Sequence, residues 1–315
     1  MMNIGILEVV LAILVVGSVI IILERKIVRT IIYLEIFTLL VALVFLFLAA
    51  PDVAMAEAVI GSFAVIFFVV VFEKILKPTG FKEIAKKSTS LLRYILPGIL
   101  IVFLIGLTIW HAPIGESNPY LRDQYIARFA DEIGGENAVA AILLGYRMYD
   151  TLLEALILLI SVIAVIHMSG YEEYEVEATV RCDHIHTHID KSDIAYSTIR
   201  AISPILLVFG GYLILNGHIS PGGGFQGGVV IASFFVVRYM IYDIYDIKVR
   251  HALVMEKLVF IGITILASAF IFLGLHPSFE PFAIPYIVAM NILIGTKVAF
   301  GVLVIFYRYV AFERR

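Results

Sequence analysis

The sequence has little charge and almost no cysteine. Charged residues make up 16% of its 315 residues, hydrophobic residues 61%, and the mean hydropathy is +1.01. A soluble globular domain carries about 25% charged residues, so this composition excludes a water-soluble protein. The single cysteine, Cys182, excludes an internal disulfide. It also excludes an iron–sulfur cluster or a structural zinc site ligated by cysteines of this chain alone.

The sequence also lacks a basic surface and a signal peptide. The net charge is −3, and no run of Lys and Arg is interleaved with aromatic residues, so we expect no nucleic-acid partner. The first apolar run, 4–23, has no basic leader, contains Glu8 and lacks a small-residue cleavage site. We therefore expect a retained helix there, and we assign no cofactor or redox chemistry to this chain.

Long apolar runs are the abundant feature. A run of about 20 residues spans a bilayer core of about 30 Å as a helix, and the sequence contains about nine of them. Their approximate limits are 4–23, 30–49, 53–72, 93–111, 149–168, 198–216, 222–241, 253–274 and 286–307. The sequence therefore predicts an all-α integral membrane protein with about nine transmembrane helices.

The positive charges are distributed unevenly between the two sides. Lys and Arg concentrate in the connections after the first, third, fifth and seventh runs and at the C-terminus. The opposite connections hold only Arg122, Arg128 and Arg147, all within segment 112–148. Because positive residues favour the cytoplasmic side, we predict an external N-terminus, a cytoplasmic C-terminus and a multi-pass protein of the cell membrane.

Two polar connections, 73–92 and 169–197, divide the chain. They predict a three-helix block at 1–90, a two-helix block with an external segment at 91–195, and a four-helix block at 196–315. No internal repeat is evident, which argues against an inverted-repeat transporter working alone. His184, His186 and His188 alternate in the second connection; a solvated docking loop is favoured over a metal site there, and we assign no metal.

Two glutamates lie inside predicted helices, in different leaflets. A charged residue deep in a membrane helix costs roughly 2.5–3.5 kcal/mol on insertion scales, which makes function the default interpretation. Glu35 lies toward the cytoplasmic side and Glu57 toward the outer side. Each can serve as a step in an ion relay; the alternative is a neutral side chain that hydrogen-bonds a neighbouring helix. Glu8 and Glu256 lie near predicted helix ends, where reaching the interface relieves the cost.

A further group of charges begins the fifth run. Arg147, Asp150 and Glu154 are spaced by three and four residues, which places them on one helix face. Arg147 and Asp150 can form an ion pair that only anchors the helix end, whereas Glu154 lies deeper. Glu154 and Glu57 lie about equally far from the outer surface, so the sequence allows both in one polar layer.

Of the charged residues in the predicted helices, Lys297 has the position with the largest expected desolvation cost. It lies about ten residues, or 15 Å, from either end of the last run, so it needs a partner or water. A buried lysine readily lowers its pKa and suits proton relay. The alternative is a static ion pair with an acid from a neighbouring helix or protein chain.

A glycine-rich segment joins the sixth and seventh runs. Its motif residues are Pro221, Gly222, Gly223, Gly224, Phe225, Gly227 and Gly228. We expect Pro221 to start the following helix, and the small-xxx-small spacing to allow close helix approach. A packing hairpin is favoured over a site that binds an anion or orients water. His218, at the rim, is either a titrating group or a turn-stabilising side chain.

Three stretches resemble components of Mrp-type antiporters. Residues 51–61, PDVAMAEAVIG, resemble the PDVAxxEAxxG signature near the C-terminus of the MrpA-type component, and 137–154 resemble the next segment of that component, with Leu153 in place of a usual glycine. Residues 217–228, GHISPGGGFQGG, are similar to the GHxSPGGGFQGG motif of the MrpB-type component. The chain thus resembles the tail of an MrpA-type protein fused to an MrpB-type protein.

This resemblance implies a sodium/proton translocation module. Such modules recur in stand-alone antiporters, archaeal membrane-bound hydrogenases, sulfane-sulfur reductases and formate hydrogenlyase-type complexes. Other membrane subunits are then the partners, and any iron–sulfur clusters and NiFe or sulfur-reducing site lie in partner subunits. We expect the chain to help move Na⁺ or H⁺ through Glu57, Glu154 and Lys297, with Glu35 extending the pathway inward; the alternative is a non-conducting scaffold.

Overall fold

A computed structural model describes residues 4–72, 98–99, 103, 106–107, 120–168, 193–242, 247–273 and 282–312. Every regular element in these ranges is helical. In chain order the elements are α1 (Ile4–Leu23), α2 (Ile27–Phe47), α3 (Pro51–Val71), α5 (Tyr120–Glu132), α6 (Ala138–Ala141), the π-helix η2 (Ile142–Tyr146), α7 (Met148–Met168), α8 (Asp193–Asn216), α9 (Gly224–Tyr242), α10 (Val249–Leu273) and α11 (Ala283–Phe312).

Seven of the described helices are long and apolar enough to cross a membrane, and α9 adds a shorter apolar stretch, Gly224–Tyr239. The predicted all-α, multi-pass class is therefore confirmed. Eight of the nine predicted runs coincide with a described helix. The ninth, 93–111, lies largely outside the described residues, so the helix count and the orientation stay predictions.

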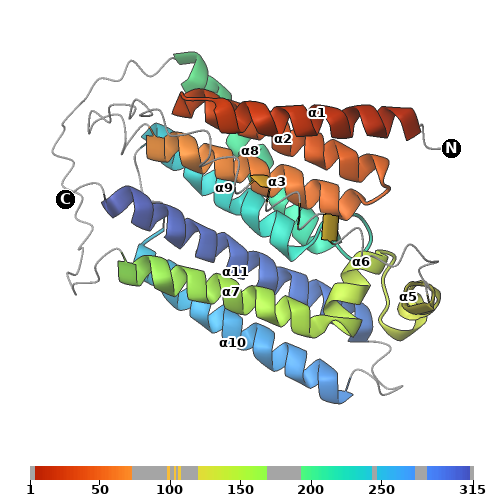
Figure 1. Cartoon of the computed structure of the whole chain (residues 1–315). Helices are drawn as coiled ribbons and strands as arrows, with labels where there is room; N and C mark the ends of the chain where they lie inside the picture. The colour runs from red at the N-terminus through yellow and green to blue at the C-terminus, as the bar shows by residue number, and fades with distance from the viewer. Residues whose placement is uncertain are drawn as a thin grey trace.

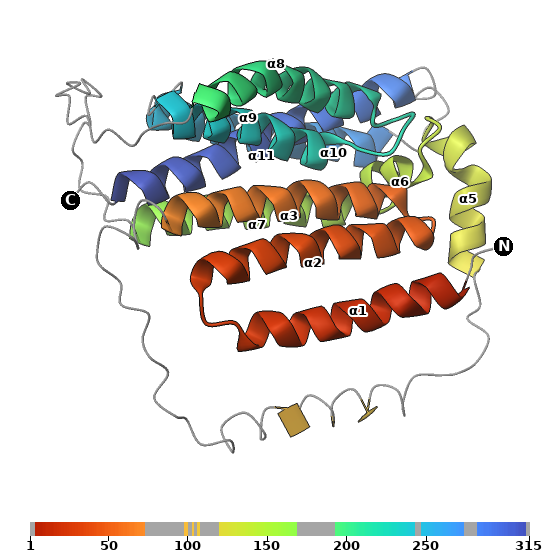
Figure 2. The ribbon, with the colours of Figure 1, turned by 90° about the horizontal axis from the view of Figure 1, so that it is seen from above.

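The long helices run roughly parallel to one another, while α5 lies across one end of them (Figures 1 and 2). α1 packs on α2, α2 on α3, and α3 on α9. On the other side, α11 contacts α7, α8, α9 and α10. Among the described helices, α11 is thus the central one, and α1 is at the margin.

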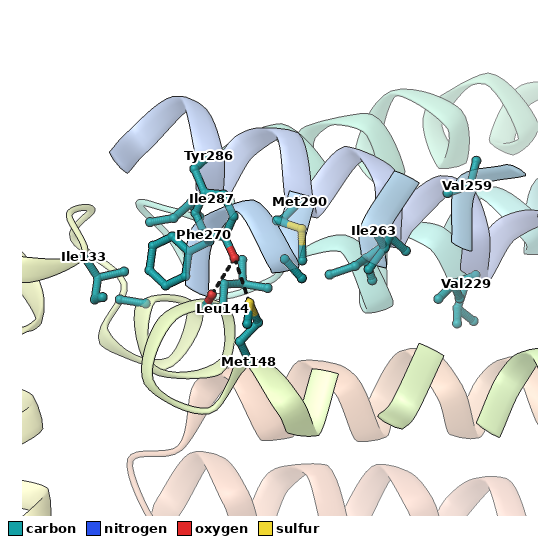
Figure 3. Packing of buried hydrophobic residues seen from close by; sticks show 14 residues of the cluster. Ile133, Leu144, Met148, Val229, Val259, Ile263, Phe270, Tyr286, Ile287 and Met290 are labelled. Atoms are coloured by element: carbon teal, nitrogen blue, oxygen red, sulfur yellow. Dashed lines mark hydrogen bonds between the residues drawn. The ribbon is translucent and has the colours of Figure 1, made fainter. Parts of the chain in front are cut away.

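The largest apolar cluster surrounds the first half of α11 (Figure 3). Ile287 and Met290 are fully buried there, together with Ile263 of α10. Tyr286 stacks on Phe270, and its hydroxyl donates to the carbonyl oxygen of Leu144 at 2.9 Å. Leu144 lies in η2, so this bond ties η2 to α11.

The turn between α1 and α2 is ordered by Glu24. Its Oε1 accepts hydrogen bonds from the backbone N–H groups of Arg25 at 2.9 Å and Lys26 at 3.0 Å. The bond from Lys26, followed by that from Arg25, lowers the pKa of the Glu24 carboxyl below its ordinary value. Glu24 therefore stays ionised beside the basic residues of this turn.

Candidate functional site

Lys297 of α11 and Glu256 of α10 form a buried ion pair. Their side chains are 1% and 0% exposed, and the Lys297 Nζ donates a hydrogen bond to Glu256 Oε1. The ammonium also lies 4.9 Å from the centre of the Phe260 ring, a cation–π contact. Glu256 Oε2 is buried and has no hydrogen-bond partner among the described residues.

The expectation that Glu256 lies near a helix end is wrong. The predicted run began at 253, whereas α10 begins at Val249, so Glu256 lies about two turns inside the helix. Helix packing then places it opposite Lys297. The sequence did offer a signal for the position of Glu256. Lys297 needs an acid partner, and Glu256 is an acid on the preceding helix.

Burying the pair costs desolvation free energy, and removing one of its two partners destabilises the protein. Moving two charges out of water costs several kcal/mol per ion, and removing one partner leaves an uncompensated buried charge at a cost of about 3–5 kcal/mol. A proton can pass between the ammonium and the carboxylate, since the two groups share a hydrogen bond. The free Glu256 Oε2 is a further acceptor for a proton or a cation.

Glu35 and Glu57 are half-buried, on α2 and α3 respectively. Glu35 Oε1 accepts a hydrogen bond from Ser62 Oγ at 2.9 Å, while Glu35 Oε2 is buried without a partner among the described residues. This is the interhelical bond that the packing alternative requires for Glu35. Glu57 forms no hydrogen bond or ion pair with another residue that the structure describes.

The charges at the start of α7 separate into two groups. Arg147 and Asp150 form an ion pair, in agreement with the helix-anchoring alternative. Glu154 lies on the exposed side of α7, and no hydrogen bond or ion pair joins it to Glu57 within the described parts of the chain. Leu153, in place of the usual glycine, is 56% exposed and faces away from the bundle. The shared polar layer of Glu57 and Glu154 stays a prediction.

The glycine-rich segment forms a close-packed hairpin between α8 and α9. A Cβ on Gly228 would lie 2.5 Å from the carbonyl oxygen of Gly295 in α11, and one on Gly227 would lie 2.7 Å from that of Gly210 in α8. Side chains would force these backbones apart, so the glycines allow the close helix approach that the spacing predicted.

Pro221 does not start a helix, contrary to the prediction. Gly222 and Gly223 have φ angles of +141° and +143°, which no helix contains and which favour glycine. α9 therefore begins only at Gly224. The Gly224 N–H donates to Asn291 Oδ1 at 3.1 Å, so a side chain of α11 caps α9.

A second buried polar cluster, centred on Asp52 and Asn137, was not expected from the sequence. Asn137 Nδ2 lies 3.1 Å from Asp52 Oδ1 and 3.1 Å from the carbonyl oxygens of Gly217 and Ser220. Asp52 Oδ1 also accepts from the Gly222 N–H at 3.1 Å. Both side chains are 8% exposed. Both occur in the motif stretches above, and an Asn before an alanine-rich helix is a cap signal.

His218 takes part in this cluster through its backbone. Its carbonyl oxygen accepts hydrogen bonds from the N–H groups of Glu136 and Asn137 at 2.8 and 3.0 Å. Its ring Nδ1 lies 3.1 Å from the carbonyl oxygen of Leu215. This geometry agrees with the turn-stabilising alternative. The residues His184, His186 and His188 lie outside the described residues.

Two family models match the sequence. Residues 194–313 match a domain related to the MnhB subunit of Na⁺/H⁺ antiporters, and residues 12–77 match MbhD, the D subunit of MBH. A probable K⁺/H⁺ antiporter A/B subunit from Rhizobium meliloti is 25% identical over 226 residues, which cover 64% of this chain and 22% of that relative. The chain therefore corresponds to only part of the relative's length.

Two solved structures resemble the fold. The Mrp complex from Dietzia sp. DQ12-45-1b aligns with a TM-score of 0.73 and 19% identity, over 95% of this chain and 34% of that one. The archaeal membrane-bound sulfane sulfur reductase aligns with a TM-score of 0.55 and 27% identity, over 68% of this chain and 95% of that one. The resemblance to Mrp-type proteins is therefore confirmed, and the first structure shows likeness of fold alone.

Proposed function

We propose that this chain, which carries an MnhB-related domain at 194–313 and an MbhD region at 12–77, is a membrane subunit of a Na⁺/H⁺ antiporter-like module and helps to move Na⁺ or H⁺. The observation that carries the proposal is the buried Lys297–Glu256 pair inside the MnhB-related domain. Intramembrane charges of this kind mark ion and proton pathways. A packing role alone would be served at lower cost by apolar side chains.

The exposed Glu154 supports the presence of other membrane subunits. Charged side chains within membrane helices almost always face a bundle interior or a water-filled cavity. Glu154 faces the outside of this chain, so a neighbouring protein chain or a hydrated space covers it in the assembly. We propose the pathway Glu57, Glu154 and Lys297, with Glu35 toward the cytoplasm, in a cell-membrane complex whose metal clusters, where present, lie in partner subunits.

Ion flux through the assembled complex tests this function. The complex is purified with its partner chains and reconstituted into vesicles, and Na⁺ and H⁺ fluxes are measured for Glu57→Gln and Glu154→Gln. We expect a fall of about tenfold or more, since each change removes a group that can bind a cation or exchange a proton. Glu8→Gln, the same change on the marginal helix α1, is the matched control. Unchanged fluxes in both pathway variants would reject the proposal.

The second candidate function is a non-conducting scaffold that bridges an antiporter-like protein to the rest of the complex. The hydrogen bond from Ser62 of α3 to Glu35 of α2 favours it, because a non-conducting role predicts that the buried acids act as interhelical hydrogen bonds. The double variant Glu256→Gln with Lys297→Met separates the two functions, because it keeps shape and removes both charges. Full flux in this variant supports the scaffold, and lost flux with normal assembly supports conduction.

A further inference from the structure

The hairpin between α8 and α9 is held through its backbone. Three carbonyl oxygens, of Gly217, His218 and Ser220, and one amide, of Gly222, bond to residues before position 138. The bonding residues are Asp52, Glu136 and Asn137. The hairpin and these residues are 80 to 170 positions apart in the chain. The rest of the chain therefore contacts the hairpin through backbone groups of the hairpin and not through its side chains.

The orientation of the Asn137 side chain is determined by its surroundings. Its Oδ1 accepts hydrogen bonds from the N–H groups of Val139 at 3.0 Å and Ala140 at 3.3 Å, which caps α6. Its Nδ2 faces three oxygen acceptors. A flipped amide would place an oxygen against these acceptors and lose both cap bonds. One side chain thus has two separate tasks: its oxygen caps a helix and its nitrogen binds the hairpin.

Glycines shape both the segment before Asn137 and the hairpin itself. Gly134 and Gly135 have φ angles of +87° and +86°. A Cβ on Gly135 would lie 2.9 Å from the carbonyl oxygen of His218. A Cβ on Gly217 would lie 2.7 Å from the Cα of Gly223. Because Gly135 has no side chain, its backbone can approach the His218 carbonyl oxygen, and because Gly217 has none, the hairpin can close on Gly223.

Asp52 supplies the charge. It lies in the first turn of α3, where a carboxylate is favoured by the helix dipole. Its Oδ1 binds the Gly222 N–H two residues before α9 begins. This amide lies outside α9, so the bond holds the turn that precedes the helix.

We infer that the Asp52–Asn137 cluster is a docking interface that joins the MnhB-related region to the MbhD region. These regions match models of two separate subunits, and Asn137 lies between them in the sequence. The partner that this interface fits is a glycine-rich hairpin between two membrane helices, recognised by its backbone carbonyls and one amide. The two regions are then separable units, and the polar contact fixes the register of their apolar faces.

The test uses the full-length chain with a protease site inserted between residues 169 and 192. After purification in mild detergent and cleavage, one piece carries Asp52 and Asn137 and the other carries the hairpin. We measure their co-elution as the SDS fraction rises. The two pieces of the cleaved chain without a substitution are expected to co-elute up to a higher SDS fraction than those of the Asp52 and Asn137 variants. Asn137→Asp keeps the cap oxygen but replaces the donor nitrogen with an oxygen that faces Asp52 Oδ1. We therefore expect association at least about tenfold weaker, from the lost hydrogen bonds and the added repulsion.

Asn291→Asp is the matched control. It makes the same change at a buried asparagine inside one region, keeps the Oδ1 that accepts from Gly224, and removes an Nδ2 that has no partner among the described residues. We expect its pieces to co-elute as in the unchanged chain. Asp52→Ala is expected to weaken association like Asn137→Asp. If both variants match the control, the regions dock through apolar faces alone and the inference is wrong. The readout is association, so the result is independent of ion flux.

Discussion

In the first and last described helices, hydropathy and burial are related in the opposite way to that in a soluble protein. α1 has a mean hydropathy of 3.1 over its membrane window, of which 6% is buried, whereas α11 has 2.1 with 61% buried. The more apolar helix is the more exposed one. In a bilayer, lipid tails are as apolar as leucine, so burial brings no hydrophobic gain and helices associate through close packing and polar contacts.

The two helices also differ in the residues that make their contacts. α11 carries Asn291, Gly295 and Lys297 at its contacts with α9 and α10. Among the described residues, α1 packs chiefly on α2. A Cβ on Gly17 would lie 3.8 Å from the Phe37 ring, an ordinary contact distance. Small and polar residues therefore make the contacts at the centre of this protein, whereas the marginal helix makes few such contacts. The following predictions test this contrast, from the largest effect to the smallest.

Lys297→Met should destabilise the chain most. It leaves Glu256 charged and unpaired in the interior, which costs about 3–5 kcal/mol. The measurement is the midpoint of unfolding in detergent against SDS fraction or temperature. Adding Glu256→Gln to Lys297→Met should restore most of the loss. A double variant as unstable as the single one would show that the ion pair is not the source of the effect.

Ile287→Ala in α11 should come next. Ile287 is fully buried, and the cavity left by such a truncation costs about 2–5 kcal/mol in soluble proteins. We expect the lower end, because the transfer part of that cost is absent in lipid. Ile13→Ala on α1, where the side chain is 49% exposed, should leave the same unfolding midpoint nearly unchanged. Equal losses at both sites would contradict the contrast between the two helices.

Gly228→Ala should cost about 1–3 kcal/mol through overpacking, since the new methyl group would lie 2.5 Å from the backbone oxygen of Gly295. Gly211→Ala on α8 is the matched control, because nothing lies within 4 Å of its Cβ position. There the higher helix propensity of alanine is expected to be neutral or stabilising. Thermal midpoints in one detergent compare the pair, and a harmless Gly228→Ala would refute the close-packed seam.

Ala49→Gly should give the smallest change, and a gain. Ala49 has a φ of +56° in the turn between α2 and α3, where a left-handed residue other than glycine costs roughly 1–2 kcal/mol. The greater freedom of unfolded glycine offsets part of this, so a gain of about 0.5–1 kcal/mol is expected. A lower thermal midpoint for this variant would show that the turn is not strained.

Much of the fold followed from the sequence, but individual contacts did not. Run lengths near 20 residues predicted the eight long apolar helices that the structure describes, since the bilayer sets that length, but they did not predict α5, α6 or η2. The position of Glu256 was misjudged because a boundary error of four residues moved it from the interior to the end of α10. Pro221 was misjudged because two glycines with positive φ follow it before α9 begins. The ion pathway, the division into three blocks and the orientation stay predictions.

The sequence by itself determined the membrane class, the apolar helices and the resemblance to Mrp-type proteins, because hydropathy and short motifs are local properties of the chain. Only the tertiary structure decided that Lys297 pairs with Glu256 and that Asp52 and Asn137 bind the glycine-rich hairpin. Both depend on the rotation and register of helices that are distant in sequence. In a bilayer, these are set by backbone approach and buried polar bonds, and a pattern of apolar residues carries no information on either.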